Sequence, residues 1–180
     1  MSTAPLDVPS PSLVLLVGVA GCGKSTFAAR WFVETEVVSS DRCRALICDD
    51  PGDQSVTADA FSLLRTLIDR RLRHRRLTVV DATNVKRRDR RRVIGIAEAH
   101  GVPAVAVVLD LPLDVCRERD IARPHPVGPE VQDRQFRDLV RTRGQLDDEG
   151  YVRVHHITDP DELVTRPVVR VPVDGPAAEA

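Results

Sequence analysis

Residues 18–25 read Gly-Val-Ala-Gly-Cys-Gly-Lys-Ser, which matches the pattern G-x-x-x-x-G-K-[ST]. The pattern follows an apolar run at 12–17 and opens an expected helix over 24–33, the strand–loop–helix context of a phosphate-binding loop. Glycines let backbone N–H groups curl around phosphate oxygens, and the helix N-terminus adds partial positive charge. A chance glycine-rich turn is the alternative. The residues expected to hold a nucleotide are Gly18, Gly21, Cys22, Gly23, Lys24, Ser25 and Thr26.

Two side chains of this loop carry specific chemistry. Lys24 can reach the β- and γ-phosphates of ATP or another NTP as a compact positive charge. The hydroxyl of Ser25 can be a ligand of Mg²⁺. We therefore expect Lys24 to be catalytic and Ser25 to bind the metal.

Strand-like and helical segments alternate along the rest of the chain. The run 102–109 is almost continuously apolar, as in a strand buried on both faces, whereas 57–76 has apolar residues at helical intervals. Further strands are expected over 36–39, 77–80 and 151–157, and further helices over 86–100, 113–123 and 130–143. This alternation predicts a P-loop NTPase-type α/β fold, with a parallel β-sheet flanked by helices.

The length of 180 residues suits a single domain with a substantial core. We expect this domain to span 12–165, after a flexible N-terminus at 1–11 and before a Pro/Val/Ala-rich tail or linker at 166–180. The apolar run at 13–17 is too short to cross a membrane, and the first residues lack a basic region. The sequence therefore predicts a cytoplasmic protein that does not associate with membranes.

Composition restricts the classes of partner. The 26 Lys and Arg residues against 27 Asp and Glu give a formal net charge of −1, which excludes coating of nucleic acid by charge alone. Aromatic residues make up 3% of the chain, too few for a long base-stacking track. The four cysteines form no C-x-x-C pair, which indicates reduced thiols rather than disulfides or a zinc site.

Asp81 directly follows the apolar segment 77–80. A carboxylate at the carboxyl end of a strand faces the ligand crevice of an α/β sheet. In a phosphate-binding-loop protein this position supports Mg²⁺, and we expect Asp81 to do so through a water molecule. The alternative is that Asp81 only caps the following helix, and Thr83 and Asn84 are better candidates for caps than for ligands.

The segment after the expected strand 36–39 contains Asp41 and Arg44. One helix and one strand separate Asp41 from Lys24, so the chain returns to the same end of the sheet. A phosphoryl acceptor needs a carboxylate to position its hydroxyl and take its proton, and Arg44 could hold an acidic group of the substrate. The alternative is that Asp41 is only a helix cap and Arg44 only a solvated side chain.

Arg119 and Arg123 lie four residues apart on an expected helix, directly before the proline-rich segment 124–129. A basic helix joined to such a hinge suits a helical lid whose arginines stabilise charge on a transferring phosphoryl group. The alternative is internal pairing with Glu118 and Asp120. The basic clusters at 70–76 and 86–92 are interpreted mainly as solvated helix surface, with nucleic-acid binding as the alternative.

Several segments together resemble the kinase domain of the bacterial polynucleotide kinase-phosphatase of RNA repair and, more loosely, the bacteriophage 5′-kinase. They are GVAGCGKST at 18–26, EVVSSDRCRALICDDPGDQSVTADAF at 36–61, LTVVDATN at 77–84, PAVAVVLDLP at 103–112 and VCRERDIAR at 115–123. The run SSDxxR followed by DDxxDQSVTxxAF is far more specific than a phosphate-binding loop alone. The resemblance extends over residues 12–165.

This resemblance implies a 5′-OH polynucleotide kinase that moves the γ-phosphate of ATP or another NTP to an RNA or DNA end, in end healing and repair. It implies Asp41 as general base, Arg44 as the grip on the phosphate next to the 5′-terminal nucleoside, and Arg119 and Arg123 as lid arginines on the NTP. It also implies downstream phosphatase and ligase domains, which this chain is too short to contain. The competing interpretations are a kinase of a small anionic metabolite and a non-catalytic nucleotide-binding regulatory module.

Overall fold

The centre of the molecule, in a computed structural model that describes residues 4–173, is a parallel five-stranded sheet. Its strand order is β3-β4-β2-β5-β6. The strands are β2 (Leu13–Val17), β3 (Val37–Ser39), β4 (Thr78–Asp81), β5 (Ala104–Leu109) and β6 (Arg153–Ile157). Each of them lies within one residue or two of a strand expected from the sequence. The prediction of an α/β fold with a parallel sheet is confirmed.

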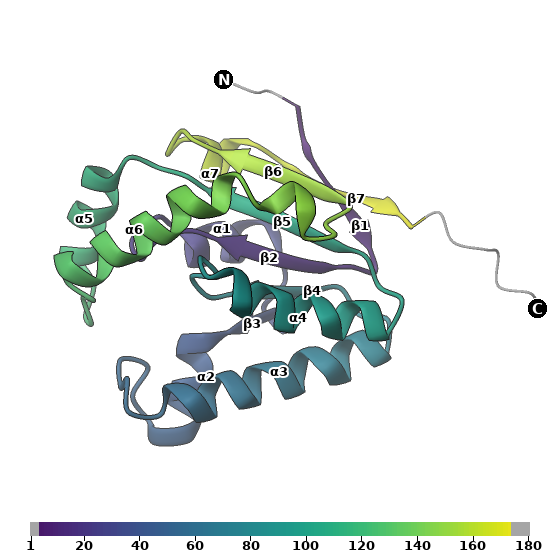
Figure 1. Cartoon of the computed structure of the whole chain (residues 1–180), viewed down its shortest axis with the longest axis horizontal. Helices are drawn as coiled ribbons and strands as arrows, with labels where there is room; N and C mark the ends of the chain where they lie inside the picture. Colours follow the sequence, from purple (N-terminus) through teal and green to yellow (C-terminus); the bar gives the residue numbers. More distant parts are fainter. Residues whose placement is uncertain (1–3, 174–180) are drawn as a thin grey trace, which may run out of the picture.

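Helices cover both faces of this sheet (Figure 1). On one face lie α1 (Lys24–Trp31) and the short α7 (Glu162–Thr165). The other face carries α3 (Thr57–Arg73), α4 (Arg87–Ala99) and α6 (Pro129–Arg143). The helices α2 (Ser40–Cys48) and α5 (Leu113–Ile121) lie toward the edge at which the strands end, and short 3₁₀ turns occupy Glu34–Glu36 and Leu146–Asp148.

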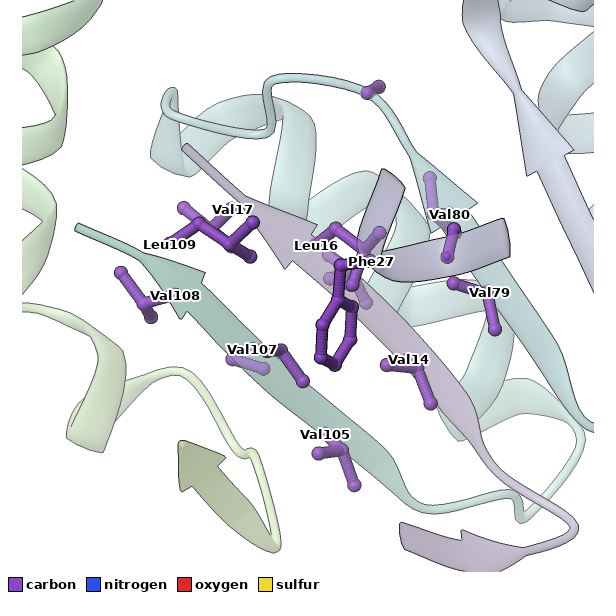
Figure 2. Packing of buried hydrophobic residues seen from close by; sticks show 14 of the residues in the cluster. Val14, Leu16, Val17, Phe27, Val79, Val80, Val105, Val107, Val108 and Leu109 are labelled. Atoms are coloured by element: carbon purple, nitrogen blue, oxygen red, sulfur yellow. The ribbon is translucent and has the colours of Figure 1, made fainter. Parts of the chain in front are cut away.

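The core is built from the two central strands. Every residue of β2 and of β5 is buried, because both strands have neighbours on each side and helices on each face. Such strands bury apolar side chains in both directions, which explains their nearly continuous Val and Leu content. Figure 2 shows the ring of Phe27 from α1 lying over β2, close to Val14 and Leu16. In α4 the expected core residues Val93, Ile94 and Ala97 are indeed buried.

Both ends of the described chain differ from the expectation of flexible segments. Residues Leu6–Ser10 form β1, which pairs in parallel with β7 (Val168–Pro172) in a separate two-stranded sheet. Leu6 and Val8 are fully buried, so β1 is fixed by apolar burial rather than left in solvent. Both strands contain proline, which is tolerated in edge strands, and both of these strands are edges. The remaining tail residues 174–180 lie outside the described residues.

All four cysteines are free thiols. Within residues 4–173, no three or more His, Cys, Asp and Glu side chains gather into a group that could hold a metal ion. No helix in that range is long and apolar enough to span a bilayer.

Candidate functional site

The loop between β2 and α1 has a backbone that only glycine adopts without strain at two positions. Gly21 has φ +81° and Gly23 has φ +93°. A Cβ atom on Gly21 would collide with the backbone carbonyl oxygen of Cys116 on α5. A Cβ atom on Gly23 would lie 2.8 Å from the Cδ1 atom of Leu163. The loop therefore needs these glycines both for its curvature and because α5 and α7 pack closely against it.

Lys24 lies inside this loop. Its side chain is buried, and its ammonium donates hydrogen bonds to the carbonyl oxygens of Gly18 and Val19, at 3.0 and 2.7 Å. The Sγ atom of Cys22 is 3.6 Å from the same nitrogen. A positive charge held at the centre of a glycine-lined cradle, at the N-terminus of α1, is a suitable environment for phosphate groups.

Ser25 and Asp81 meet at the carboxyl edge of the sheet. The Ser25 hydroxyl donates a 2.8 Å hydrogen bond to Oδ2 of Asp81. Burial raises the pKa of Asp81, and this rise is opposed by the Lys24 charge and the Ser25 hydrogen bond. A hydroxyl and a carboxylate in contact are hard oxygen donors of the kind that Mg²⁺ prefers. Ser25 and Thr26, both expected to bind the nucleotide, are exposed in the first turn of α1.

The residues after Asp81 do not cap a helix, which corrects the expectation for Thr83 and Asn84. Helix α4 begins at Arg87, and its N-cap residue makes no side-chain cap. Asn84 is buried, and its amide donates to the carbonyl oxygen of Leu16 at 2.8 Å. The carbonyl oxygen of Thr83 accepts a hydrogen bond from Gly18. Both residues therefore tie the end of β4 to the start of the phosphate-binding loop.

Asp41 and Arg44 project from the first turns of α2, which follows β3 directly. Ser39, the last residue of β3, is the N-cap of α2, so Asp41 is not the cap. Ser39 also pairs in register with Asp81 of β4, which brings α2 to the edge that holds Ser25. Arg44 is buried and donates to Asp41 at 2.6 Å. It is thus a fixed partner of the Asp41 carboxylate and not a solvated side chain.

The two lid arginines point to different parts of the site. Helix α5 ends at Ile121, so Arg123 lies beyond it, which corrects the expectation that it shares a helix face with Arg119. A proline disfavours helical backbone in the residue before it, and Arg123 directly precedes Pro124. Arg119 reaches the loop, where a Cβ atom on Gly23 would lie 3.4 Å from its Nη1 atom.

Arg123 instead joins the lid to Asp41. Its guanidinium is 3.3 Å from Oδ2 of Asp41 and 3.7 Å from Oδ1 of Asp120. Asp120 is almost fully buried, and its Oδ2 atom accepts hydrogen bonds from the backbone N–H groups of Val127 and Gly128. The alternative of internal pairing therefore holds for Asp120 in part, because the same arginine also binds Asp41. Asp120 shapes the turn that aims Arg123 at Asp41.

The lid also contacts the loop between α2 and α3. The imidazole of His125 lies against Gly52, where a Cβ atom would be 2.8 Å from the ring. Its Nε2 atom is 3.9 Å from Oδ1 of Asp50. Asp50 and Gly52 belong to the segment DDPGDQSVT that carried much of the family resemblance. The segment thus contacts the same turn that contains Arg123.

Sequence reasoning missed two glutamines of α6 that hold the loop. Oε1 of Gln135 accepts a 2.8 Å hydrogen bond from the backbone N–H of Ala20. Nε2 of Gln132 donates to the carbonyl oxygens of Ala20 and Cys116, at 3.1 and 3.2 Å. Both polar groups of Ala20 are therefore bound by side chains one helical turn apart. The spacing i, i+3 was the only signal in the sequence, and it is common in helices.

A second missed feature is a buried ion pair behind the site. Arg90, expected at a solvated surface, is fully buried and binds both oxygens of Glu149, at 2.7 and 2.6 Å. It also donates to the Asn84 carbonyl oxygen and to the Thr142 hydroxyl, each at 2.9 Å. The signal was present, because position 90 falls on the same helical stripe as the core residues 93, 94 and 97. Because arginine is charged, position 90 was predicted to be exposed despite its place on that stripe.

Several solved structures share this fold. A chain of the Pnkp1/Rnl/Hen1 RNA repair complex is 22% identical over 78% of this chain and 47% of that chain, with a TM-score of 0.63. A gluconokinase from Sinorhizobium meliloti 1021 is 21% identical over 88% of this chain and 90% of that one, with a TM-score of 0.53. The APS kinase of Mycobacterium tuberculosis is 19% identical over 87% and 95%, with a TM-score of 0.51. The chain thus spans about half the length of the repair-complex protein. It spans most of the length of the gluconokinase and of the APS kinase.

The fold is therefore that of P-loop kinases, as the parallel sheet and the loop geometry indicate. No curated protein matches the sequence. A family described as AAA domain (AAA_33) matches residues 13–146, which include the phosphate-binding loop, Asp41, Asp81 and both lid arginines. The chain belongs to this AAA_33 family.

Proposed function

We propose that this protein is a 5′-OH polynucleotide kinase that transfers the γ-phosphate of ATP or another NTP to the 5′ end of RNA or DNA. The observation that carries the proposal is the environment of Asp41. Its carboxylate lies at the same sheet edge as Ser25 and Asp81 and contacts both Arg44 and Arg123. An acceptor-side carboxylate between two guanidiniums suits a hydroxyl acceptor that carries a nearby phosphate.

In the proposed reaction the acceptor oxygen attacks the γ-phosphorus in line with the bond to the β–γ bridging oxygen. A new oxygen–phosphorus bond forms as that bond breaks, and the nucleoside diphosphate leaves. Asp41 accepts the proton of the 5′-hydroxyl, so that the attacking oxygen does not become a cation. The charge that develops on the transferred group is stabilised by Lys24, Arg119 and Arg123.

The loop residues fit a nucleoside triphosphate with Mg²⁺. The positive φ values of Gly21 and Gly23 curve the loop, and the Lys24 ammonium lies inside that curve against the Gly18 and Val19 carbonyl oxygens. Ser25, supported by Asp81, would hold the metal ion, which supplies neutralisation of the phosphate charge. The chain's own contribution is positioning: α5 and α6 fix the loop, and Asp120 fixes Arg123.

End recognition agrees with the charge of the molecule. An enzyme that grips one or two phosphates needs local arginines such as Arg44, and a net charge of −1 is compatible with that. The likeness to a chain of an RNA repair complex supports a role in end healing. We further propose that phosphatase and ligase activities act with this domain, on the same polypeptide or on partner proteins, in the cytoplasm.

A kinase of a small anionic metabolite is the second candidate. The gluconokinase and the APS kinase match this chain over almost their full lengths, and the buried Arg44 could hold many kinds of anion. A regulatory module that binds nucleotide without turnover is less well supported, because it has no need of an acceptor-side carboxylate such as Asp41.

The test uses γ-labelled ATP, Mg²⁺ and a 5′-OH oligonucleotide, with a 5′-phosphorylated oligonucleotide as blank acceptor. We expect label only on the 5′-OH strand. Asp41→Asn should lower transfer by about 10²–10⁴-fold, the usual contribution of a positioned base, while ATP affinity stays within about twofold. The control Asp59→Asn makes the same change at an exposed position of α3.

Two outcomes contradict the proposal. Transfer to a metabolite pool with none to any oligonucleotide would assign the second candidate. Transfer by Asp41→Asn within a few-fold of wild type would remove Asp41 from the role of base and leave the substrate open.

A further inference from the structure

Helix α4 carries a group of four exposed arginines near its N-terminus. Arg87, Arg88, Arg91 and Arg92 together line a surface hollow of about 510 Å³. We call this group the α4 arginine patch. Its members are spaced i, i+1, i+4 and i+5, so they form two adjacent rows on one face of the helix.

This arrangement is unfavourable for the helix itself. Arg87 with Arg91, and Arg88 with Arg92, are like charges four residues apart, which destabilise a helix. Arg87 and Arg88 also lie in the first turn, where the partial positive charge of the helix terminus opposes cations. Local folding energetics therefore do not account for the patch.

The other arginine clusters differ in this respect. Arg70, Arg71 and Arg73 occupy the last turn of α3, where the helix dipole favours cations. Arg71 is also used internally, since it donates to the carbonyl oxygen of Leu77 at 2.9 Å. Arg141 and Arg143 similarly lie in the last turn of α6. Of these clusters, only the α4 arginine patch works against its own helix.

Nearby carboxylates do not neutralise the patch. Asp89 is the shared partner of Arg88 and Arg92, at 3.6 and 4.0 Å. Arg87 is 3.6 Å from Glu149, but both oxygens of that carboxylate already bind the buried Arg90. Within residues 4–173, Arg91 has no carboxylate within ion-pair distance. The patch thus keeps excess positive charge toward solvent, although the whole chain has a net charge of −1.

The position of the patch links it to the candidate site. Helix α4 follows β4, whose last residue is Asp81, so the first turn of α4 lies toward the sheet edge that also holds Asp41 (Figure 1). On the other side the patch is bounded by acidic residues, because Arg91 also lines a neighbouring hollow with Glu98, Asp148 and Glu149. A polyanion could therefore extend from the site onto the patch and would be repelled beyond it.

We propose that the α4 arginine patch binds the phosphodiester backbone of the nucleic-acid strand whose 5′ end occupies the candidate site. This inference rests on the proposed polynucleotide kinase function. Guanidinium groups pair with phosphate oxygens in a bidentate manner, and such contacts position a strand without reading its bases. The patch gives the enzyme a preference for strands over short 5′-OH acceptors, independent of sequence.

The experiment compares a patch variant, R87Q/R88Q/R91Q/R92Q, with a control variant, R70Q/R73Q/R76Q/R141Q, which removes the same charge from exposed positions elsewhere. Binding of a 3′-fluorescein 12-nucleotide strand is measured by anisotropy at several salt concentrations. We expect about tenfold or greater loss of affinity in the patch variant only. The slope of log K against log salt should fall by about 0.7 for each phosphate that the protein no longer neutralises.

A kinetic measurement separates the patch from the reacting centre. In the patch variant KM for the 12-nucleotide acceptor should rise about tenfold, with kcat and KM for a 5′-OH trinucleotide unchanged. The thermal midpoint should stay the same or rise, because like-charge repulsion in α4 is removed.

The outcomes distinguish the two proposals. If the wild type neither binds nor phosphorylates any oligonucleotide, the proposed function itself fails. If the wild type does both, but the patch variant matches the control in affinity, salt slope and KM, the α4 inference is wrong and the proposed function stands. Poly-glutamate binding that is as tight as strand binding, and is abolished in the patch variant, would assign the patch to an acidic polypeptide and overturn it too.

Discussion

At the scale of single residues, the phosphate-binding loop depends on a glycine at position 21, where no side chain fits, and on the position of the Lys24 ammonium. Gly21 must have positive φ, and α5 approaches it so closely that no side chain fits. Lys24 is one of only two lysines in the chain and lies with its ammonium between two loop carbonyls. A compact point charge suits this place, because the forked guanidinium of arginine is larger and planar.

Substitution at Gly21 tests this scale. Gly21→Ala should abolish detectable ATP binding and lower the thermal midpoint, because the new Cβ atom both strains φ and displaces the Cys116 carbonyl. The matched control is Gly95→Ala in α4, where no atom lies within 4 Å of a built Cβ, which should stabilise the protein by about 0.5–1 kcal/mol. Binding of a fluorescent ATP analogue and thermal unfolding measure both. Unchanged binding in Gly21→Ala would contradict the packing argument.

At the scale of elements, helix α6 and the turn after α5 contact different parts of the site. Helix α6 is attached to the loop through Gln132 and Gln135, whereas the turn after α5 reaches Asp41 through Arg123. The loop is thereby held from one side, and the Asp41 carboxylate is contacted from the other. Helix α4 adds rigidity behind both, because Arg90 connects it to Glu149 and to Thr142 of α6.

The glutamine contacts are tested by Gln132→Leu. This change keeps the side-chain volume but leaves the carbonyl oxygens of Ala20 and Cys116 without their donor in a buried place, which costs about 1–3 kcal/mol. We expect about tenfold weaker ATP binding, measured by calorimetry. Arg137→Leu, at an exposed position of the same helix, is the control. Equal ATP affinities of the two variants would show that the glutamine does not position the loop.

The buried ion pair is tested by Arg90→Met. Loss of Arg90 leaves the buried Glu149 carboxylate with only the half-exposed Arg87, 3.6 Å away, so the free energy of unfolding should fall by about 3 kcal/mol. The double variant Arg90→Met/Glu149→Leu should recover a large part of this loss, since it removes the isolated charge. Urea denaturation of the three proteins measures the cycle. A loss below about 1 kcal/mol in the single variant would contradict the assignment.

At the scale of the whole molecule, two sheets are joined across the chain ends. The small β1–β7 sheet is connected to the large one through His155 of β6, whose Nε2 atom is 2.9 Å from the carbonyl oxygen of Asp7. Burial lowers the pKa of His155, although the hydrogen bond to Asp7 opposes this shift. Because a carbonyl oxygen only accepts hydrogen bonds, Nε2 must carry a proton in this contact, and burial disfavours a second proton on the ring.

This arrangement predicts acid destabilisation. Because the folded-state pKa of His155 lies below its unfolded value of about 6.5, the unfolded state binds more protons at mildly acidic pH. The contribution of His155 is present above about pH 6.5 and disappears as the pH falls through the folded-state value. The urea midpoint of the wild type should drop more between pH 7.5 and 5.5 than that of His155→Gln, which keeps an amide donor. Equal drops would exclude the histidine as the cause.

The sequence predicted most of the fold and the loop because both depend on local information. Hydrophobic periodicity placed the five strands of the large sheet to within a residue or two, and the spacing of Gly18, Lys24 and Ser25 indicated the loop. Periodicity failed for β1 and β7, which are short, contain proline and pair with each other in a two-stranded sheet. Strands of that kind have no signal of their own.

The roles of the arginines were decided by the tertiary structure. Arg123 contacts a residue 82 positions away, Arg90 one 59 positions away, and Gln135 an amide 115 positions away. In sequence, Arg90 and Arg91 belong to one basic run, but one is fully buried in an ion pair and the other lines an exposed patch. Local sequence determines which face of a helix a residue occupies. What that face packs against depends on segments far away in the chain. A charged side chain is buried only where such a segment supplies a partner that offsets the free-energy cost of its desolvation, and otherwise it stays exposed.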